Sequence, residues 1–168
     1  GCGLICKYCW VSDAVMFHPA EVGKCYGPAV AARLLAKMAK KRNLRQLRVS
    51  GGEPTIGKRH LLQLLDGLEG QSLHFVLETN GILIGNDPRY AEDLSKYGFL
   101  HVRVSLKGCS EKEFAVLTGA KSEGFTLQLK ALENLLRQGV SCHPAAMTSF
   151  STKESTQSLV ERLKIINP

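Results

Sequence analysis

The chain has 168 residues, of which 44% are hydrophobic and 22% charged, a composition typical of a soluble domain large enough to bury a core. No apolar run reaches the ~20 residues that cross a bilayer, and no basic segment followed by an apolar one marks an export signal. These features exclude a membrane-spanning protein and argue against a secreted disulfide scaffold. We therefore expect a cytoplasmic protein whose six cysteines serve metal or redox chemistry.

Three thiols stand at the start of the chain, where Cys2, Cys6 and Cys9 form a C-x3-C-x2-C pattern. Thiolates at this spacing can bind one small metal centre, because the intervening loop can fold around it. A structural zinc ion needs four ligands, usually from paired C-x-x-C units, and no second pair exists here; His18 or Cys25 would complete such a site only at an unusual spacing. Three ligands on a four-iron cluster instead leave one iron open for a small molecule.

The remaining thiols, Cys25, Cys109 and Cys142, are scattered along the chain. We expect them to be ordinary small buried residues without a role in metal binding.

A helix is predicted from Pro28, with an apolar face formed by Val30, Ala31, Leu34, Leu35 and Met38. The net charge of +7 arises largely at its end, from Lys37, Lys40, Lys41, Arg42, Arg45 and Arg48. Two interpretations remain open: a solvated helix end, whose cations suit the helix dipole, or a docking patch for RNA or an acidic partner.

Beyond this helix, short apolar runs alternate with helical patterns. Strands are predicted over residues 46–50, 73–77, 100–106 and 140–147. Helices are predicted from Leu61 to Leu68, from the Asp87-Pro88 cap to Gly98, after the Ser110–Glu113 capping box, from Leu127 to Arg137, and after Ser151 with Leu159, Val160, Leu163 and Ile166 facing inward. Such alternation predicts an α/β fold with a parallel sheet, either a barrel or an open sheet.

Polar and glycine-rich segments directly follow three of the predicted strands. They are Ser50-Gly51-Gly52-Glu53-Pro54, Glu78-Thr79-Asn80-Gly81 and Ser105-Leu106-Lys107-Gly108. Ligands bind at the carboxyl ends of parallel strands in both architectures. The chemistry is therefore expected at one rim of the sheet.

The C-x3-C-x2-C array with Tyr8 before its last cysteine, followed by GGEP after a strand and by a TNG turn, resembles the radical S-adenosylmethionine (radical SAM) enzymes. The resemblance extends from Cys2 to about Met147. It implies a partial TIM-type (β/α)6 barrel with parallel strands. Residues 1–168 would form a single core domain, truncated at both ends, with the first strand and the last βα unit outside the chain.

By this resemblance, Cys2, Cys6 and Cys9 bind a [4Fe–4S] cluster, and S-adenosylmethionine completes the coordination. Gly51, Gly52 and Glu53 would form a cradle for the methionine amino group, since glycine allows a close backbone approach. Lys107 would pair with the methionine carboxylate and Ser105 with a ribose hydroxyl, although related activating enzymes often have Asp in place of Ser105. Glu78 and Asn80 would lie near the adenosyl group.

His143 begins a segment ending at Met147, at the predicted end of the last strand. We expect it either to reach the cofactor or substrate or to be a rim histidine without a chemical role.

The implied reaction is reductive cleavage of S-adenosylmethionine to a 5′-deoxyadenosyl radical that abstracts hydrogen from a substrate. The nearest resemblance is to the pyruvate-formate-lyase-activating group, whose substrate is a glycyl radical enzyme. Modification of tRNA or of a peptide is the alternative within the family, with nucleic acid not favoured. A non-catalytic metal-binding or redox-sensing module is the alternative of another class. The chemistry also implies a low-potential electron donor, such as flavodoxin or ferredoxin.

Overall fold

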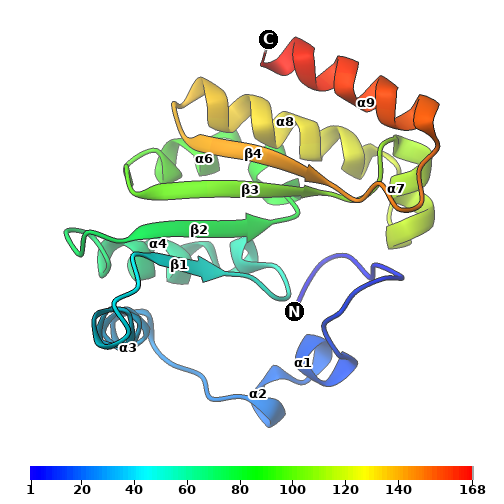
Figure 1. The fold of residues 1–168 in the computed structure, drawn as a ribbon. Coiled ribbons are helices and arrows are strands. Elements are labelled where there is room, and N and C mark those ends of the chain that lie inside the picture. Colours follow the sequence, from blue (N-terminus) through cyan, green and yellow to red (C-terminus); the bar gives the residue numbers. More distant parts are fainter. Residues whose placement is uncertain (168) are drawn as a thin grey trace.

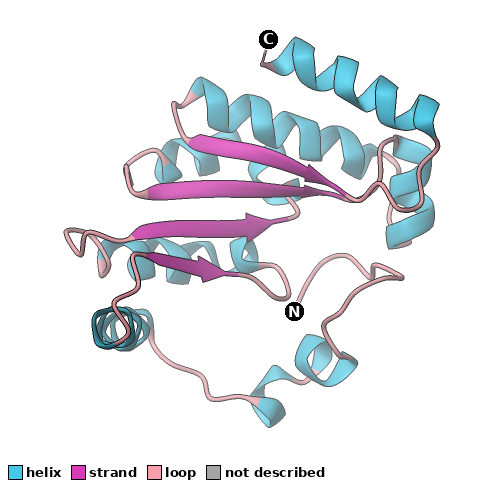
Figure 2. Ribbon diagram, in the orientation of Figure 1, coloured by secondary structure: helices cyan, strands magenta, loops and turns pink. Residues whose placement is uncertain are grey.

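The protein forms a four-stranded parallel sheet whose strands follow one another in chain order, β1-β2-β3-β4. The computed structural model describes residues 1–167. The strands are β1 (Gln46–Val49), β2 (His74–Thr79), β3 (Leu100–Leu106) and β4 (Ser141–Ala146). Helices connect them in βα units, as Figures 1 and 2 show. The α/β class and the parallel strands predicted from the sequence are confirmed, and the sheet corresponds to part of a (β/α) barrel.

The helices and short helical turns lie between the strands and at both ends. They are α1 (Asp13–Phe17), α2 (Pro19–Val22), α3 (Pro28–Lys41), the 3-10 turn η1 (Pro54–Gly57), α4 (Lys58–Asp66), α5 (Ile82–Asn86), α6 (Pro88–Leu94), α7 (Glu111–Thr118), α8 (Glu123–Arg137) and α9 (Lys153–Ile166).

The two faces of the sheet differ in chemistry, because successive side chains of a strand point to opposite sides. On one face, Leu77, Val102 and Val104 are fully buried and belong to the apolar core, to which the covering helices contribute Phe114, Phe125 and Leu135. On the other face, β3 presents His101, Arg103 and Ser105, all half-buried. The helices thus cover one face, and the polar face stays open towards the N-terminal segment (Figure 1).

Several helix ends match the capping signals in the sequence. Asp87 accepts a hydrogen bond from the N–H of Arg89 (3.1 Å), and Pro88 occupies the first turn of α6. Ser110 accepts one from the N–H of Glu113 (3.3 Å) at the start of α7. The predicted capping box is only half formed, because the Glu113 carboxylate bonds the N–H of Cys109 (2.7 Å) instead of that of Ser110.

Some sequence expectations about the helices were wrong. Helix α6 ends at Leu94 instead of near Gly98, since the Ser95 hydroxyl donates to the carbonyl of Glu92 (2.8 Å) in its last turn. The short α5 was not predicted. Val160, expected to face inward from α9, is 39% exposed, whereas Leu159 is buried.

Helix α3 faces the core with a stripe that matches the predicted one only in part, since Ala31 and Leu35 pack against the core as predicted. Ala32 and Ala39 are buried, while Val30, Leu34 and Met38 are exposed. The reason is a close approach to the end of α4: a Cβ added at Gly67 would lie 2.7 Å from the Cβ of Ala32, so small side chains are needed where the two helices meet.

Candidate functional site

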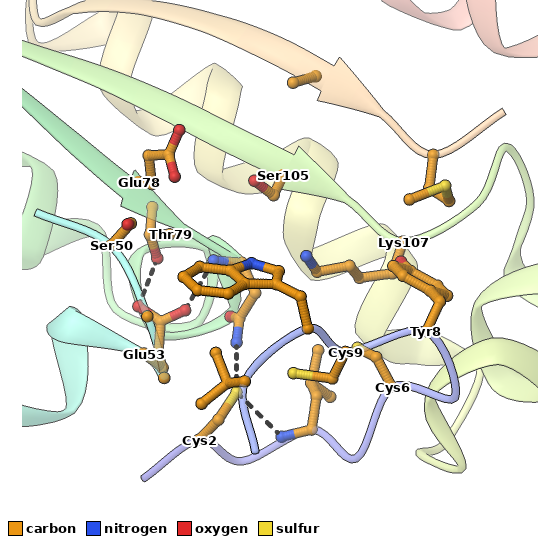
Figure 3. A pocket seen from close by; sticks show the side chains of 18 of the residues that line it. Cys2, Cys6, Tyr8, Cys9, Ser50, Glu53, Glu78, Thr79, Ser105 and Lys107 are labelled. Carbon is orange, nitrogen blue, oxygen red and sulfur yellow. Dashed lines mark hydrogen bonds between the residues drawn. The ribbon is translucent and has the colours of Figure 1, made fainter. Parts of the chain in front are cut away.

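A cavity of about 290 Å³ opens at the carboxyl ends of the strands, beside the N-terminal loop (Figure 3). Every site residue proposed from the sequence lines it except His143. The lining set includes Cys2, Cys6, Cys9, Gly51, Gly52, Glu53, Glu78, Asn80, Ser105 and Lys107, together with Leu4, Tyr8, Trp10, Thr79, Arg103 and Met147. Segments from all four strand ends therefore meet the thiol loop at one rim.

The thiol loop is held against the fold at three points. The carbonyl of Gly1 accepts a hydrogen bond from the N–H of Glu53 (2.8 Å), and the N–H of Lys7 donates to the carbonyl of Leu117 at the end of α7 (2.9 Å). Between them, the Leu4 side chain is 4% exposed and part of the core. These contacts place a loop of little regular structure at a defined position over the sheet edge.

The three thiols differ in their surroundings. Cys2 and Cys6 are half-buried and Cys9 is exposed. Burial raises the pKa of the Cys6 thiol, and the positive charge of Lys107 opposes this shift. Within residues 1–167, no three His, Cys, Asp or Glu side chains converge tightly enough to hold a single metal ion. The three thiols lie along the N-terminal loop on one side of the cavity (Figure 3).

The GGEP loop needs its glycines for two separate reasons. Gly51 and Gly52 have positive φ values of 83° and 58°, which side-chain-bearing residues rarely adopt. In addition, a Cβ at Gly52 would lie 2.5 Å from the carbonyl oxygen of Gly1. The backbone of the loop thus lies directly against the thiol segment and exposes peptide groups to the cavity.

Glu53 is 6% exposed, and hydrogen bonds occupy both of its carboxylate oxygens. Oε1 accepts from the N–H of Thr55 (3.0 Å), the Thr55 hydroxyl (2.5 Å) and the Thr79 hydroxyl (2.7 Å); Oε2 accepts from the N–H of Asn80 (2.7 Å). The Glu53 side chain therefore ties the loop after β1 to the turn after β2.

Asn80 turns its side chain towards the first thiol. Its Nδ2 lies 3.7 Å from Sγ of Cys2, and its Oδ1 accepts from the N–H of Ile82 (3.0 Å). The N–H of Leu4 also donates to the Cys2 sulfur (3.4 Å). Two N–H groups thus point at the Cys2 sulfur.

The Gln128 side chain of α8 forms hydrogen bonds with the backbone at the ends of β2 and β3. It is fully buried, and its Nε2 donates to the carbonyls of Asn80 (2.5 Å) and Ser105 (2.9 Å). Its Oε1 accepts from the N–H of Lys107 (3.0 Å). A single amide therefore satisfies backbone groups at the ends of β2 and β3 and fixes the backbone from which the Lys107 side chain extends.

Glu78 lies between two arginines on the open face of the sheet. Its Oε1 is 3.3 Å from Nη1 of Arg48 and 3.3 Å from Nη1 of Arg103. Arg103 also donates to the Ser105 hydroxyl (3.1 Å). Two guanidinium groups thus share one carboxylate, and of these three residues Glu78 and Arg103 line the cavity.

Tyr8 carries an unpaired polar atom. Its hydroxyl is buried without a hydrogen-bond partner in the described part of the chain, and its ring stacks on Phe150, with 5.6 Å between the centroids. Burial raises the Tyr8 pKa well above its ordinary value, and the nearby thiols Cys6 and Cys9 add to the shift.

His143 lies away from the cavity, on the open face of β4. Its Nδ1 is 2.6 Å from Nε2 of His101, and the two rings stack with 4.9 Å between their centroids. Burial lowers the His101 pKa, and His143 and His74 lower it further. The residues of β4 and its following loop that reach the cavity are Ala145, Ala146 and Met147.

The other thiols are not part of the cavity lining. Cys109 is buried and Cys142 half-buried, but Cys25 is exposed in the segment before α3, so its expected burial was wrong.

Sequence reasoning missed Thr79, Gln128 and Arg103. Gln128 left a signal: it stands on the apolar face of α8 with Phe125, Leu132 and Leu135, where a polar residue needs a buried partner. Thr79 and Arg103 left none, because the acids that they bind, Glu53 and Glu78, are 26 and 25 residues away in the sequence.

Comparison with known proteins gives a family match over most of the chain. The model of the Radical SAM superfamily matches residues 1–163. No helix within residues 1–167 has the length and apolar character required to span a membrane.

Individual relatives differ in their named activities. GTP 3',8-cyclase of Corynebacterium glutamicum (strain R) is 32% identical over 123 residues, which cover 70% of this chain and 31% of that protein. Pyruvate formate-lyase-activating enzyme of Clostridium pasteurianum is 27% identical over 171 residues, which cover 99% of this chain and 67% of that protein. The chain thus spans about a third of the cyclase and two thirds of the activating enzyme.

Solved structures share the fold. Streptococcus suis SuiB bound to S-adenosylmethionine superposes with a TM-score of 0.75 at 22% identity, covering 98% of this chain and 34% of that one. SuiB bound to its precursor peptide SuiA gives a TM-score of 0.77 at 23% identity, covering 98% and 35%.

Proposed function

The chain belongs to the radical SAM superfamily, and we propose that it is an enzyme that binds a [4Fe–4S] cluster through Cys2, Cys6 and Cys9 and S-adenosylmethionine beside them. The observation that carries the proposal is the single cavity that the thiol loop shares with the GGEP, TNG and Ser105–Lys107 segments. When bound, the reduced cluster would supply one electron for the reductive cleavage of S-adenosylmethionine, and the radical released by that cleavage would abstract hydrogen from a substrate.

The residues that line the cavity fit a [4Fe–4S] cluster and S-adenosylmethionine. Three thiols on one loop are the soft ligands that iron–sulfur clusters take, and all three line the cavity. Gly51 and Gly52 line the cavity, and their positive φ values present a backbone without side chains to it. The amino group of S-adenosylmethionine could donate hydrogen bonds to the carbonyls of this backbone, and the Lys107 ammonium could pair with its carboxylate.

The chain's own residues hold and orient the segments that line the cavity. Glu53 fixes the GGEP loop against the TNG turn, and Gln128 fixes the backbone on which Lys107 stands. Tyr8, whose ring stacks on Phe150, supplies an aromatic side chain to the cavity lining beside the thiols. The alternative function, a non-catalytic metal-binding or redox-sensing module, would give no reason for the thiols, the GGEP loop and Lys107 to line the same cavity.

The test is anaerobic reconstitution with iron and sulfide, followed by reduction and electron paramagnetic resonance. We expect a [4Fe–4S]⁺ signal whose shape changes when S-adenosylmethionine is added. Lys107→Ala should keep the cluster and weaken S-adenosylmethionine binding, with Lys130→Ala, an exposed α8 lysine, as the control. Zinc in place of iron, or a cluster signal indifferent to S-adenosylmethionine, would contradict the assignment.

For the substrate, we propose first a macromolecule: a glycyl radical enzyme or a peptide. The alignment of 99% of the chain with pyruvate formate-lyase-activating enzyme and the likeness to SuiB, solved with a precursor peptide, support this class. The test is a glycyl radical signal in a purified partner enzyme after incubation with the reduced protein, S-adenosylmethionine and a low-potential flavodoxin or ferredoxin. If no polypeptide partner changed the rate of deoxyadenosine formation, this would argue against a macromolecular substrate.

A small anionic substrate is the second candidate, and the Arg48–Glu78–Arg103 row favours it. The side chains of Arg48 and Arg103 are 60% and 38% exposed and share one carboxylate, so the three groups together carry positive charge beside the cavity that Glu78 and Arg103 line. The relatives named GTP 3',8-cyclase suggest the probe. GTP binding measured by equilibrium dialysis should weaken in Arg103→Gln and remain in Arg89→Gln, whose arginine is exposed on α6.

The structure gives tRNA less support. The exposed basic residues Lys40, Lys41, Arg42 and Arg45 precede β1, whereas the cavity lies beyond the other end of that strand. Phosphate contacts at this patch would bind nucleic acid at the end of the sheet remote from the thiols. A tRNA affinity that falls steeply with added salt, together with tRNA-dependent turnover, would reverse this preference.

A further inference from the structure

We propose that Asn80 raises the reduction potential of the cluster by donating its side-chain N–H to the sulfur of Cys2. The inference rests on the proposed function in one respect, namely that Cys2 is a cluster ligand. It makes Asn80 a positioning residue that acts through Cys2.

The orientation of the Asn80 amide is determined by its second partner. Oδ1 accepts from the N–H of Ile82 (3.0 Å), in a turn that opens α5. An amide flipped by 180° would place its NH2 group against this N–H, which is itself a donor. Nδ2 must therefore face Cys2, where it lies 3.7 Å from Sγ.

Asn80 is held by its backbone as well. Its N–H donates to Oε2 of Glu53 (2.7 Å), and its carbonyl accepts from Nε2 of Gln128 (2.5 Å). The residue is 6% exposed. A buried donor held by three other hydrogen bonds is already in place when charge on the sulfur increases, so no reorganisation is needed.

The Cys2 sulfur is distinguished from the other two by this contact. It receives the Asn80 amide and the N–H of Leu4, whereas within residues 1–167 no side-chain donor reaches the sulfur of Cys6 or Cys9. Lys107 acts on Cys6 through its charge. Removing the Asn80 amide should therefore change one sulfur and leave the others as they are.

A hydrogen bond to a ligand sulfur stabilises negative charge on it. Because the reduced cluster carries one electron more than the oxidised cluster, the bond favours the reduced state and raises the potential. Asn80 would thus make the cluster easier to reduce by a protein donor, independently of any contact with S-adenosylmethionine.

The test is a redox titration of the reconstituted protein, without S-adenosylmethionine, followed by electron paramagnetic resonance. Asn80→Ser keeps a side-chain oxygen for the N–H of Ile82 but cannot reach the sulfur. Asn80→Asp keeps the shape and replaces the donor with an acceptor. In both variants we expect the one-electron equilibrium to shift towards the oxidised state, by about threefold to tenfold in Asn80→Ser, where tenfold equals ~59 mV.

Asn134→Ser is the matched control. Asn134 is another buried asparagine, 7% exposed, and its amide donates to the carbonyl of Ile84 (3.0 Å) outside the cavity lining. Its replacement should leave the potential unchanged. Wild-type potentials in both Asn80 variants, measured on intact clusters, would overturn the inference. A wild-type protein that binds no such cluster would instead refute the proposed function.

Discussion

The carboxylate of Glu53 accepts a hydrogen bond of 2.7 Å from the backbone N–H of Asn80. This bond joins the loop after β1 to the turn after β2, and the same carboxylate also binds Thr55 and Thr79. The Glu53 side chain of the GGEP motif therefore serves to hold two segments of the protein together.

Glu53→Gln should weaken this junction. An amide supplies an NH2 group where the carboxylate accepted from several donors, so one or more buried donors lose their partner. We expect a loss of about 1–3 kcal/mol in the free energy of unfolding and weaker S-adenosylmethionine binding. Urea unfolding and calorimetry would measure these, with Glu133→Gln on the exposed face of α8 as control. Unchanged stability would mean that the bonds of Glu53 contribute nothing net.

Gln128→Leu tests the amide that joins two strand ends. Leucine has a similar volume but leaves the N–H of Lys107 and the carbonyls of Asn80 and Ser105 without this partner. We expect a loss of at least ~2 kcal/mol in unfolding free energy, because each unsatisfied buried group costs about 1–3 kcal/mol. Gln138→Leu, at the exposed end of α8, should have little effect. A stable Gln128→Leu protein would show that other groups or water satisfy these atoms.

Gly85→Ala should be severely destabilising. The added Cβ would overlap the backbone carbonyl of Leu127, because α5 packs directly against α8. A backbone atom cannot move aside as a flexible side chain does, so we expect a cost of about 3 kcal/mol or more in unfolding free energy. Gly98→Ala is the control, since no atom lies within 4 Å of the place where its new methyl group would stand and its φ is ordinary. Thermal unfolding of both variants decides the point.

Glu113→Gln should change how the free energy of unfolding depends on pH under acidic conditions. Burial alone would raise the pKa of the Glu113 carboxyl, but hydrogen bonds from Ser151, Ser155 and the N–H of Cys109 outweigh it and lower the pKa below its ordinary value of 4.5. The group therefore contributes stability that is complete above about pH 4.5 and is lost as the pH falls through the folded pKa.

In Glu113→Gln this contribution is absent at every pH. The difference in unfolding free energy from the wild type should be about 1–3 kcal/mol at pH 7, towards the lower end because the side chain is partly exposed, and should shrink below pH 4.5. Urea titrations between pH 3 and pH 7 would show this. A difference that stays constant with pH would contradict the assignment.

Cysteine replacement separates the cluster ligands from the other thiols. Replacing Cys2, Cys6 or Cys9 with Ala should abolish the intact cluster, because the proposed function makes each of them one of its three ligands. Cys109→Ala should retain full iron, since Cys109 is buried in the core and outside the cavity lining. Iron and sulfide analysis after reconstitution distinguishes the two classes. A loss of iron in Cys109→Ala would assign it a role that the structure does not indicate.

Much of the fold followed from local patterns. The bounds of β3 were predicted to the residue, and the starts of α3 and α7 follow from Pro28 and Ser110, because alternation and capping depend on neighbours in sequence. The same holds for the three segments at the cavity: a residue directly after a parallel strand must lie at the carboxyl edge of the sheet. The thiol spacing similarly required one loop to hold all three sulfurs.

What the sequence could not determine depends on contacts between distant segments. The inward stripe of α3 follows from the close approach of Gly67 to Ala32, and the buried amide of Gln128 follows from the crossing of α8 over two strand ends. His143 was placed by register: it stands two residues before Ala145, about 6–7 Å down the strand from the cavity. Local pattern decides which way a side chain can point, whereas packing between elements decides what it meets.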